Sequence, residues 1–214
     1  MDSPLPDPED LTARARIRDA AMLHFGERGF EQATIRGIAE TAGVSSGLVR
    51  HHFGSKQGLR EECDAYLIKV MRRLNDQAQA DPTAADVNYV AVGRAAVGPY
   101  QRYLARSLAE GSAAAVFDEM VGMSERWLVD ADKSRPDPPD VDRKSRAAVI
   151  TAMALAVSIL HPHLSRNMGV DVFSPDGDQL LARTLVDIYS HPMLSVEDAA
   201  AIRAALDKIQ PASP

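Results

Sequence analysis

The stretch TIRGIAETAGVSSGLVRHHFGSK, residues 34–56, contains two short helical patterns separated by one glycine. Thr34 is a favoured N-cap residue, and the apolar side chain of Ile38 predicts a buried face for the helix that follows. Gly43 suits a left-handed turn, and Ser45 caps a second helix that extends to about residue 52. Helix, tight turn and helix in this order predict a helix-turn-helix, whose second helix enters the major groove of DNA.

The second of these helices carries many polar side chains. Val44, Val49 and Phe53 are expected to lock it onto its neighbours, and the small Ala39 lets the two helices cross closely. The groups left outside are hydroxyls, imidazoles and cations, which hold phosphates and read base edges. Arg50 is expected to read bases, and Lys56 to hold a phosphate. The predicted DNA contacts are Thr34, Arg36, Ser45, Ser46, Gly47, Leu48, Arg50, His51, His52 and Lys56.

Other interpretations of the histidines and the cysteine are weaker. His51 and His52 point about 100° apart on a helix, whereas metal pairs on helices use i,i+4 spacing. The histidines on either side of Pro162 favour a solvated or core role over a ligand role. The single cysteine, Cys63, excludes an internal disulfide, and its place on an apolar helical stripe predicts a small buried side chain. No metal and no other cofactor is predicted.

Enzyme motifs and export signals are also missing from the sequence. The chain contains no GxxxxGK[ST], GxGxxG or GxSxG motif, so phosphate-loop and nucleophile-elbow enzymes lack support. The first ten residues hold four acidic residues and three prolines, unlike a signal peptide. The longest apolar run, residues 147–160, is shorter than the roughly 18 residues of a membrane span. These features predict a cytoplasmic protein without a membrane partner.

The net charge of −6 hides an uneven distribution along the chain. Residues 11–60 contain eight Lys or Arg, four Asp or Glu and three histidines, whereas residues 61–214 contain sixteen basic and twenty-two acidic residues. A basic N-terminal part on an acidic remainder indicates where an anionic partner docks. The whole-chain charge therefore does not argue against nucleic acid.

The remaining sequence follows a helical plan, with no convincing strand and no internal repeat. With 45% hydrophobic residues, the chain can bury a sizeable core. The first helix is expected to begin near Thr12 and to end at Gly29, and the fourth to run from Ser55 to about Gln79. Further helices are predicted over residues 83–97, 99–109, 112–131, 140–167, 177–190 and 195–209. The fold class is therefore all-α, with about nine or ten helices.

Residues 34–59, TIRGIAETAGVSSGLVRHHFGSKQGL, resemble the signature of the TetR family of bacterial transcriptional regulators. The resemblance covers about residues 12–75. One departure is Arg50, where the family usually has a tyrosine that touches phosphate or thymine; arginine could take a guanine or a second phosphate. The matching elements are Thr34, Ile38-Ala39, Ala42-Gly43-Val44-Ser45, Gly47, His52-Phe53, Ser55-Lys56 and Leu59, with Phe25 and the ERGF segment of residues 27–30 before them.

The resemblance implies a domain plan and a function. Residues 1–10 would be a disordered arm, residues 11–56 the helix-turn-helix DNA-binding domain, and residues 57–214 a ligand-binding and dimerisation domain joined by the long fourth helix. A homodimer would bind a palindromic operator in double-stranded DNA, most simply as a repressor, and a small apolar or aromatic effector would release it. The alternative is a helical small-molecule-binding protein or an enzyme with a structural helix-turn-helix.

Aromatic and methionine side chains suggest where the effector binds. Methionines adapt to irregular ligands, and aromatic rings supply shape with a polar tip. The predicted lining residues are Tyr66, Tyr100, Tyr103, Leu104, Phe117, Met120, Met123, Ser124 and Trp127. Taken singly, each is also typical of an ordinary core, an alternative that the sequence leaves open. A ligand beside the fourth helix is expected to tilt it and to change the spacing of the two recognition helices.

The dimer surface is predicted on residues 140–167 and 177–190. Ala148, Ala152 and Ala156 recur at i,i+4 spacing, which permits close approach of a second helix. Packing of the same row inside one subunit is the alternative.

Overall fold

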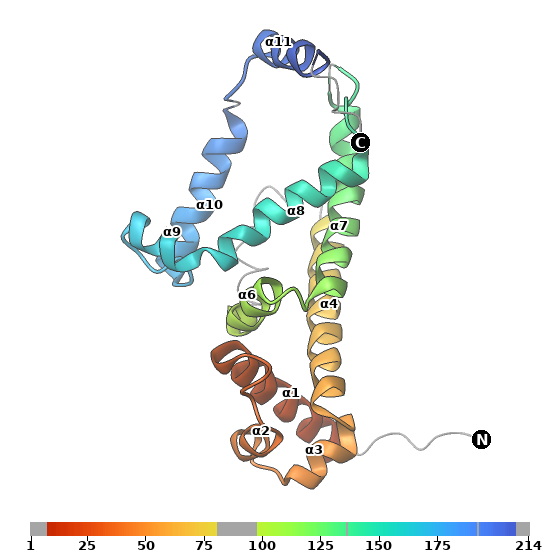
Figure 1. Ribbon diagram of the computed structural model, residues 1–214, viewed down its shortest axis with the longest axis vertical. Coiled ribbons are helices and arrows are strands. Elements are labelled where there is room, and N and C mark those ends of the chain that lie inside the picture. The colour runs from red at the N-terminus through yellow and green to blue at the C-terminus, as the bar shows by residue number, and fades with distance from the viewer. Residues whose placement is uncertain (1–7, 81–97, 136, 192, 209–214) are drawn as a thin grey trace, which may run out of the picture.

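The computed structural model describes residues 8–80, 98–135, 137–191 and 193–208, and within them every regular element is helical, as the all-α prediction requires (Figure 1). The predicted helix over residues 83–97 lies outside the described residues. The elements are α1 (Pro8–Arg28), α2 (Ile35–Ala42), α3 (Ser46–Phe53), α4 (Lys56–Ala80), the 3-10 helix η1 (Gly98–Tyr100), α6 (Gln101–Ala109), α7 (Ala114–Lys133), α8 (Arg143–Ile159), α9 (His161–Met168), α10 (Pro175–Ser190) and α11 (Val196–Leu206).

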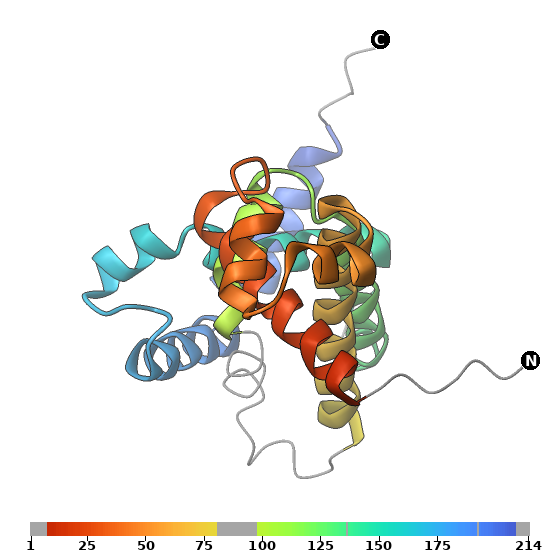
Figure 2. The same cartoon turned by 90° about the horizontal axis from the view of Figure 1, so that it is seen from below.

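The helices form a head and a body that share α4 (Figure 1). The head consists of α1, α2, α3 and the start of α4, and the body of the remaining helices. Helix α1 packs against α2, α4 and α6, while α7 packs against α4 and α8. Helices α10 and α11 make only sparse contacts with the other described helices. Seen from the head end, α9 and α10 project to one side of the molecule (Figure 2).

Local capping fixes the helix boundaries of the head as the sequence predicts. The Thr34 hydroxyl accepts a hydrogen bond from the amide N–H of Gly37 at 3.1 Å, and the Ser45 hydroxyl accepts one from Leu48 at 3.1 Å. Gly43 ends α2 in the left-handed region, with φ of 68°. The turn between α2 and α3 is therefore set by residues within the turn itself.

A continuous apolar core joins the head to the first body helices. Helices α1, α2, α3, α4, α6 and α7 each contribute at least one fully buried side chain to this core. The same cluster of contacts therefore packs all six helices together. The members of this core with at most 2% of their surface exposed are Ile17, Ala21, Met22, Phe25, Ala33, Ile38, Ala39, Val49, Leu59, Cys63, Leu67, Tyr103 and Val116.

Two predicted helix boundaries are wrong. Helix α1 begins at Pro8 and not near Thr12, because proline is compatible with the first helical turn. The single helix predicted over residues 140–167 is divided at Leu160 into α8 and α9, which are bent by 69°. Pro162 lacks the N–H that would bond the Ser158 carbonyl in a continuous helix, and the His161 ring bonds this carbonyl instead, with 2.9 Å from Nδ1 to O.

No single described helix has both the length and the apolar composition of a membrane span. Helices α8 and α9 meet both conditions when they are counted together as one bent pair.

The pairing of α7 with α8 includes an ion pair whose effect depends on pH. Arg146 donates two hydrogen bonds to Asp132, at 2.7 and 2.8 Å, and Arg143 donates another at 3.3 Å. The hydrogen bonds from Arg146, supported by Arg143, lower the pKa of Asp132 from its usual 3.8 to about 2. Because the pKa is lower in the folded state, the stabilisation is present above the usual pKa and is lost as the pH falls through about 2.

We therefore expect the Asp132→Asn variant to lose less unfolding free energy than the wild type when the pH is lowered from 5 towards 2. Urea denaturation at pH 5, 3 and 2 measures this difference. Asp130→Asn is the control, since Asp130 is exposed and its one ion pair within the described residues is with Lys133 on its own helix. Identical pH profiles for the wild type and Asp132→Asn would contradict the assignment.

Candidate nucleic-acid interface and nearby cavity

One face of α3 is buried and the other is open to solvent. Val49 is fully buried, and Val44 and Phe53 pack partly against the core, as predicted. Arg50 and His51 are exposed on the opposite face. Among the predicted contacts at the start of α3, Ser45 and Gly47 are exposed, and Ser46 and Leu48 are partly buried.

The N-terminus of α2 adds a second exposed segment to this side of the head. Thr34 and Arg36 are both exposed, and the Thr34 hydroxyl caps α2. The first amide N–H groups of a helix carry partial positive charge that suits a phosphate. The candidate DNA contacts that are exposed are called the DNA interface below; they are Thr34, Arg36, Ser45, Gly47, Arg50 and His51.

Lys56 lies apart from this exposed set because its ammonium group is already occupied. Its Nζ donates to the carbonyl oxygens of Phe30, Glu31 and Ala33 at 2.8, 3.2 and 3.2 Å. Nζ also lies 4.4 Å from the centroid of the Phe30 ring. Three donors matched by three acceptors leave no ammonium proton for a phosphate in this arrangement. Lys56 instead ties the start of α4 to the α1–α2 connection.

His52 is also turned inward rather than outward. It is partly buried, and its Nε2 is buried without a hydrogen-bond partner among the described residues. The His51 and His52 ring centroids are 5.5 Å apart. Within the described residues there is no group of three or more His, Cys, Asp or Glu side chains that could hold a metal ion.

Cys63 and His24 are core residues of the head. The Cys63 thiol is fully buried and donates to the Arg18 carbonyl at 3.8 Å, and burial raises its pKa. His24 is buried with Nε2 2.8 Å from the Thr41 hydroxyl. Burial, followed by the nearby Arg28, lowers the pKa of His24. Neither group is placed to act as a nucleophile or a ligand.

Polar contacts fasten α1 to the body. The Arg18 guanidinium lies 3.4 Å from the Tyr66 ring centroid, and the Tyr66 and Tyr100 rings meet edge to face at 5.9 Å. The Tyr100 hydroxyl donates to Asp19 at 3.0 Å. Burial and this carboxylate raise the pKa of Tyr100 to about 12.

The nine predicted lining residues lie partly in the core and partly at the surface, and their role as effector contacts stays a prediction. Tyr103 and Leu104 are core residues, with 1% and 4% of their surface exposed. Phe117 and Met120 pack against the same core, and Trp127 is 52% exposed. Of the polar members, Ser124 lies 2.9 Å from the Thr151 hydroxyl, and the Trp127 Nε1 donates to Asn75 at 2.8 Å.

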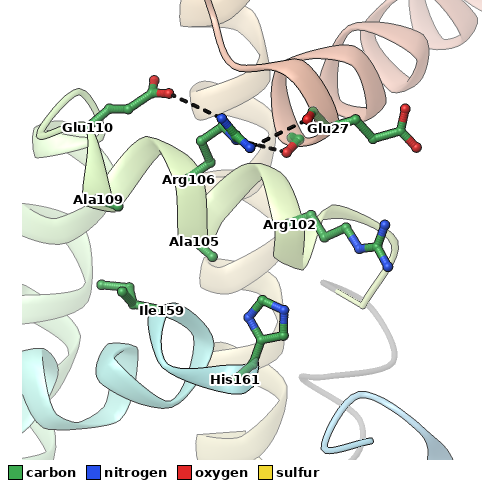
Figure 3. Close-up of a pocket in the computed structure, with 9 residues that line it drawn as sticks. Glu27, Arg102, Ala105, Arg106, Ala109, Glu110, Ile159 and His161 are labelled. Carbon is green, nitrogen blue, oxygen red and sulfur yellow. Dashed lines mark hydrogen bonds and ion pairs between the residues drawn. The ribbon is translucent and has the colours of Figure 1, made fainter. Parts of the chain in front are cut away.

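The structure shows a cavity of about 610 Å³ beside the head, called the junction cavity below. The last turn of α1, one face of α6 and the α8–α9 bend form its walls (Figure 3). Its lining residues are Gly26, Glu27, Arg102, Ala105, Arg106, Ala109, Glu110, Ile159 and His161. None of them was among the predicted effector contacts.

The sequence contained one usable signal for this cavity. Residues 102, 105, 106, 109 and 110 recur at helical spacing, so they predict one face of α6. The other walls come from the end of α1 and from the α8–α9 bend, which no periodicity places together. Aromatic and methionine side chains were the basis of the predicted effector site, and this face of α6 carries charged residues and alanines instead.

Comparison with solved structures supports the fold. The fatty acid degradation regulator FadR from Bacillus halodurans matches with a TM-score of 0.61 and 17% identity, over 79% of this chain and 90% of that chain. CprB from Streptomyces coelicolor, solved in complex with its biological operator sequence, matches with a TM-score of 0.54 and 22% identity, over 72% of this chain and 78% of that chain. Because both sequence identities are below 25%, these two matches show that the fold is shared and nothing further.

Comparison with protein families and curated proteins identifies the family. Residues 17–63 match the family described as bacterial regulatory proteins, tetR family. The chain is 35% identical over 162 residues to the HTH-type transcriptional regulatory protein RaaS of Mycobacterium tuberculosis. The aligned region covers 74% of this chain and 75% of RaaS. The similarity therefore extends well beyond the helix-turn-helix into the body. The chain belongs to the TetR family of bacterial regulatory proteins.

Proposed function

We propose that the protein is a transcriptional repressor that binds a palindromic operator as a homodimer and leaves it when a small molecule binds the body. The exposed DNA interface on a capped helix-turn-helix is the observation that supports this proposal most strongly. CprB, which shares the fold, was solved on its own operator. Membership of a family of regulatory proteins decides against the alternative of an enzyme with a structural helix-turn-helix.

Within the DNA interface, we assign base reading to Arg50. Its side chain is exposed in the last turn of α3, and an arginine can form two hydrogen bonds to one guanine. Thr34 and Arg36 are assigned to phosphates beside the groove. Lys56 and His52 are assigned structural roles in the head. The ammonium protons of Lys56 are donated to backbone carbonyl groups, and the Nε2 atom of His52 is buried.

We expect Arg50→Ala to weaken operator binding by about 1–3 kcal/mol and to change the preferred base at one position of each half-site. A gel-shift assay with the DNA beside the gene for this protein finds the operator, and a set of single-base variants of it measures the preference. Arg73→Ala, at an exposed position on α4 outside the DNA interface and the dimer surface, is the charge-matched control. Unchanged affinity together with unchanged base preference would refute the assignment of Arg50.

The dimer surface is assigned to the exposed apolar side chains of α8 and α10. Val149, Ile150 and Met153 of α8 are 59%, 42% and 59% exposed, and Val186 and Ile188 of α10 are 68% and 48% exposed. Monomeric proteins rarely leave so large an apolar surface open. A two-fold axis through this surface would let two heads read two half-sites. Ala152 is exposed in the same region, and Ala148 and Ala156 are partly buried, in keeping with the predicted close approach.

We expect the Met153→Asp variant to be monomeric at micromolar concentration, because each copy would place a charge in the apolar interface. Sedimentation velocity compares it with a dimeric wild type. Leu23→Asp is the control, since Leu23 is a comparably exposed apolar residue on α1, outside the assigned surface. A monomeric wild type, or a Met153→Asp variant that remains dimeric, would refute this dimer surface.

A further inference from the structure

We propose that the junction cavity binds a small organic anion with an apolar body, such as a medium-chain carboxylate, and that its occupant loosens the head from the body. Ligand binding in the cavity does not depend on the proposed repressor function, whereas the effect of the ligand on DNA binding rests on it. Pockets of roughly 300–1,000 Å³ suit small organic ligands, and this cavity has about 610 Å³. The ligand class follows from its lining.

The apolar part of the ligand is matched by small and aliphatic side chains. Ala105 and Ala109 face the cavity from α6, and Ile159 faces them from the end of α8 (Figure 3). Ile159 is 39% exposed in the ligand-free protein, so burying it against a hydrocarbon is favourable. Alanines on α6 leave room for this hydrocarbon, which larger side chains would fill.

The anionic part of the ligand is matched by Arg102. This residue lies one helical turn before Ala105 and Arg106, and its side chain is exposed (Figure 3). Arg102 forms no hydrogen bond or ion pair with another of the residues that the structure describes. An unpaired guanidinium beside an apolar wall is the arrangement that recognises a carboxylate.

His161 supplies a second polar atom from the opposite wall. Its Nδ1 must donate to the Ser158 carbonyl, because a carbonyl oxygen can only accept. The ring also stacks on Phe173, with centroids 4.6 Å apart. These two contacts fix the ring and leave Nε2 as a hydrogen-bond acceptor, so His161 forms part of the cavity wall but does not bind a carboxylate (Figure 3). The bend that Pro162 introduces between α8 and α9 thus places an oriented imidazole in the cavity.

The two acidic lining residues do not cancel this charge. Glu110 pairs with Arg106 on its own helix, with 4.0 Å between Oε1 and Nη1. The Glu27 carboxylate points away from Arg106, and its backbone carbonyl makes the contact with that residue (Figure 3). Arg102 is therefore the cation left for an anion, while Arg106 shares its charge with Glu110.

Arg106 connects the cavity to the head. Its Nε donates to the Gly26 carbonyl at 3.0 Å, and its Nη2 donates to the Glu27 carbonyl at 3.4 Å. Both carbonyls belong to the last turn of α1, three residues or fewer before Gly29, where the chain turns towards α2 with φ of 80°. A Cβ at Gly29 would lie 3.2 Å from Nη1 of Arg106, so the guanidinium rests against this turn.

An anion held by Arg102 would lie one helical turn from Arg106 and would compete with the α1 carbonyls for its guanidinium. A carboxylate adds Coulombic attraction to the guanidinium that a neutral carbonyl lacks. Drawing Arg106 from α1 would loosen the last turn that positions the helix-turn-helix. By linkage, ligand and operator would then weaken each other by the same factor.

Calorimetry with sodium decanoate, below the concentration at which it forms micelles, tests the site on the full-length protein. We expect decanoate to bind the wild type, decan-1-ol to bind much more weakly, and Arg102→Gln to weaken decanoate binding on the order of tenfold. Arg73→Gln on α4 is the control, since Arg73 is exposed and lies outside the cavity, and it should bind like the wild type. Absence of decanoate binding, or equal binding by Arg102→Gln and the wild type, would overturn the proposal.

A second measurement separates this proposal from the proposed function. Operator affinity is measured by fluorescence anisotropy with and without decanoate for the wild type, Arg102→Gln and Arg73→Gln. We expect decanoate to weaken operator binding by the wild type and Arg73→Gln, and to leave Arg102→Gln nearly unchanged. If the wild type binds decanoate but no operator, the repressor function fails and the site stands. If it binds the operator and decanoate independently, the coupling through Arg106 is wrong.

Discussion

Replacing Tyr103 with alanine is expected to lower the free energy of unfolding by about 3–5 kcal/mol, as for other large aromatic residues in a core. Only 1% of Tyr103 is exposed, and its ring lies 6.1 Å from that of Phe25 on α1. Its hydroxyl donates to Asp64 on α4 at 2.6 Å. The residue therefore joins three helices, and its loss should weaken operator binding together with stability. Urea denaturation at a fixed protein concentration measures the change.

Two control variants separate the contributions of this side chain. Tyr103→Phe keeps the ring but leaves the partly buried Asp64 carboxylate without its donor, which should cost about 1–3 kcal/mol. Trp127→Ala removes a larger side chain that is 52% exposed, and it should cost less than Tyr103→Ala. If Tyr103→Ala keeps wild-type stability and operator affinity while altering the ligand response, Tyr103 lines an effector site as the sequence suggested.

Replacing Gly26 with alanine is expected to destabilise the protein by about 1–3 kcal/mol, although alanine favours helix. A Cβ at Gly26 would lie 2.8 Å from the backbone N of Tyr103 and 3.1 Å from the backbone C of Arg102. Both atoms belong to the backbone of α6, so α1 and α6 would have to move apart. The same movement would stretch the Arg106 contacts, and operator affinity should fall with stability.

The matched control for Gly26 is the same substitution on α7. A Cβ at Gly122 would meet only the Nη1 atom of the flexible Arg126 side chain, at 3.7 Å. Gly122→Ala is therefore expected to stabilise the protein by up to about 1 kcal/mol through helix propensity alone. Thermal or urea unfolding of both variants compares them. Equal effects at the two positions would show that α1 and α6 do not pack as closely as described.

The head was predictable from sequence because its structure is decided by neighbouring residues. Thr34 and Ser45 cap helices that begin at the next residue, and Gly43 forms its left-handed turn without help from distant residues. The apolar residues of α1 and α3 recur at helical spacing, so the buried face could be predicted before any packing was known. The same helical spacing predicts that Arg50 and His51 lie on the solvent-exposed face of α3, where the structure places them.

The body was harder to predict because its features depend on contacts between distant residues. Pro162 was known from the sequence, but whether it ends a helix or merely bends it depends on what else satisfies the Ser158 carbonyl. His161 does so, and this contact makes it part of the junction cavity. Lys56 was expected to hold a phosphate, yet its ammonium group donates to three carbonyl groups of the α1–α2 connection.

The central claim is that two heads of a symmetric dimer read two half-sites on one face of DNA, roughly 34–36 Å apart or at a multiple of that distance. Fluorescence anisotropy with the operator, and with variants that carry five or ten additional base pairs between the half-sites, tests it directly. Five base pairs turn the second half-site to the opposite face, so the account predicts that the affinity falls to that of unrelated DNA. Unchanged affinity for the operator with five added base pairs would contradict the claim.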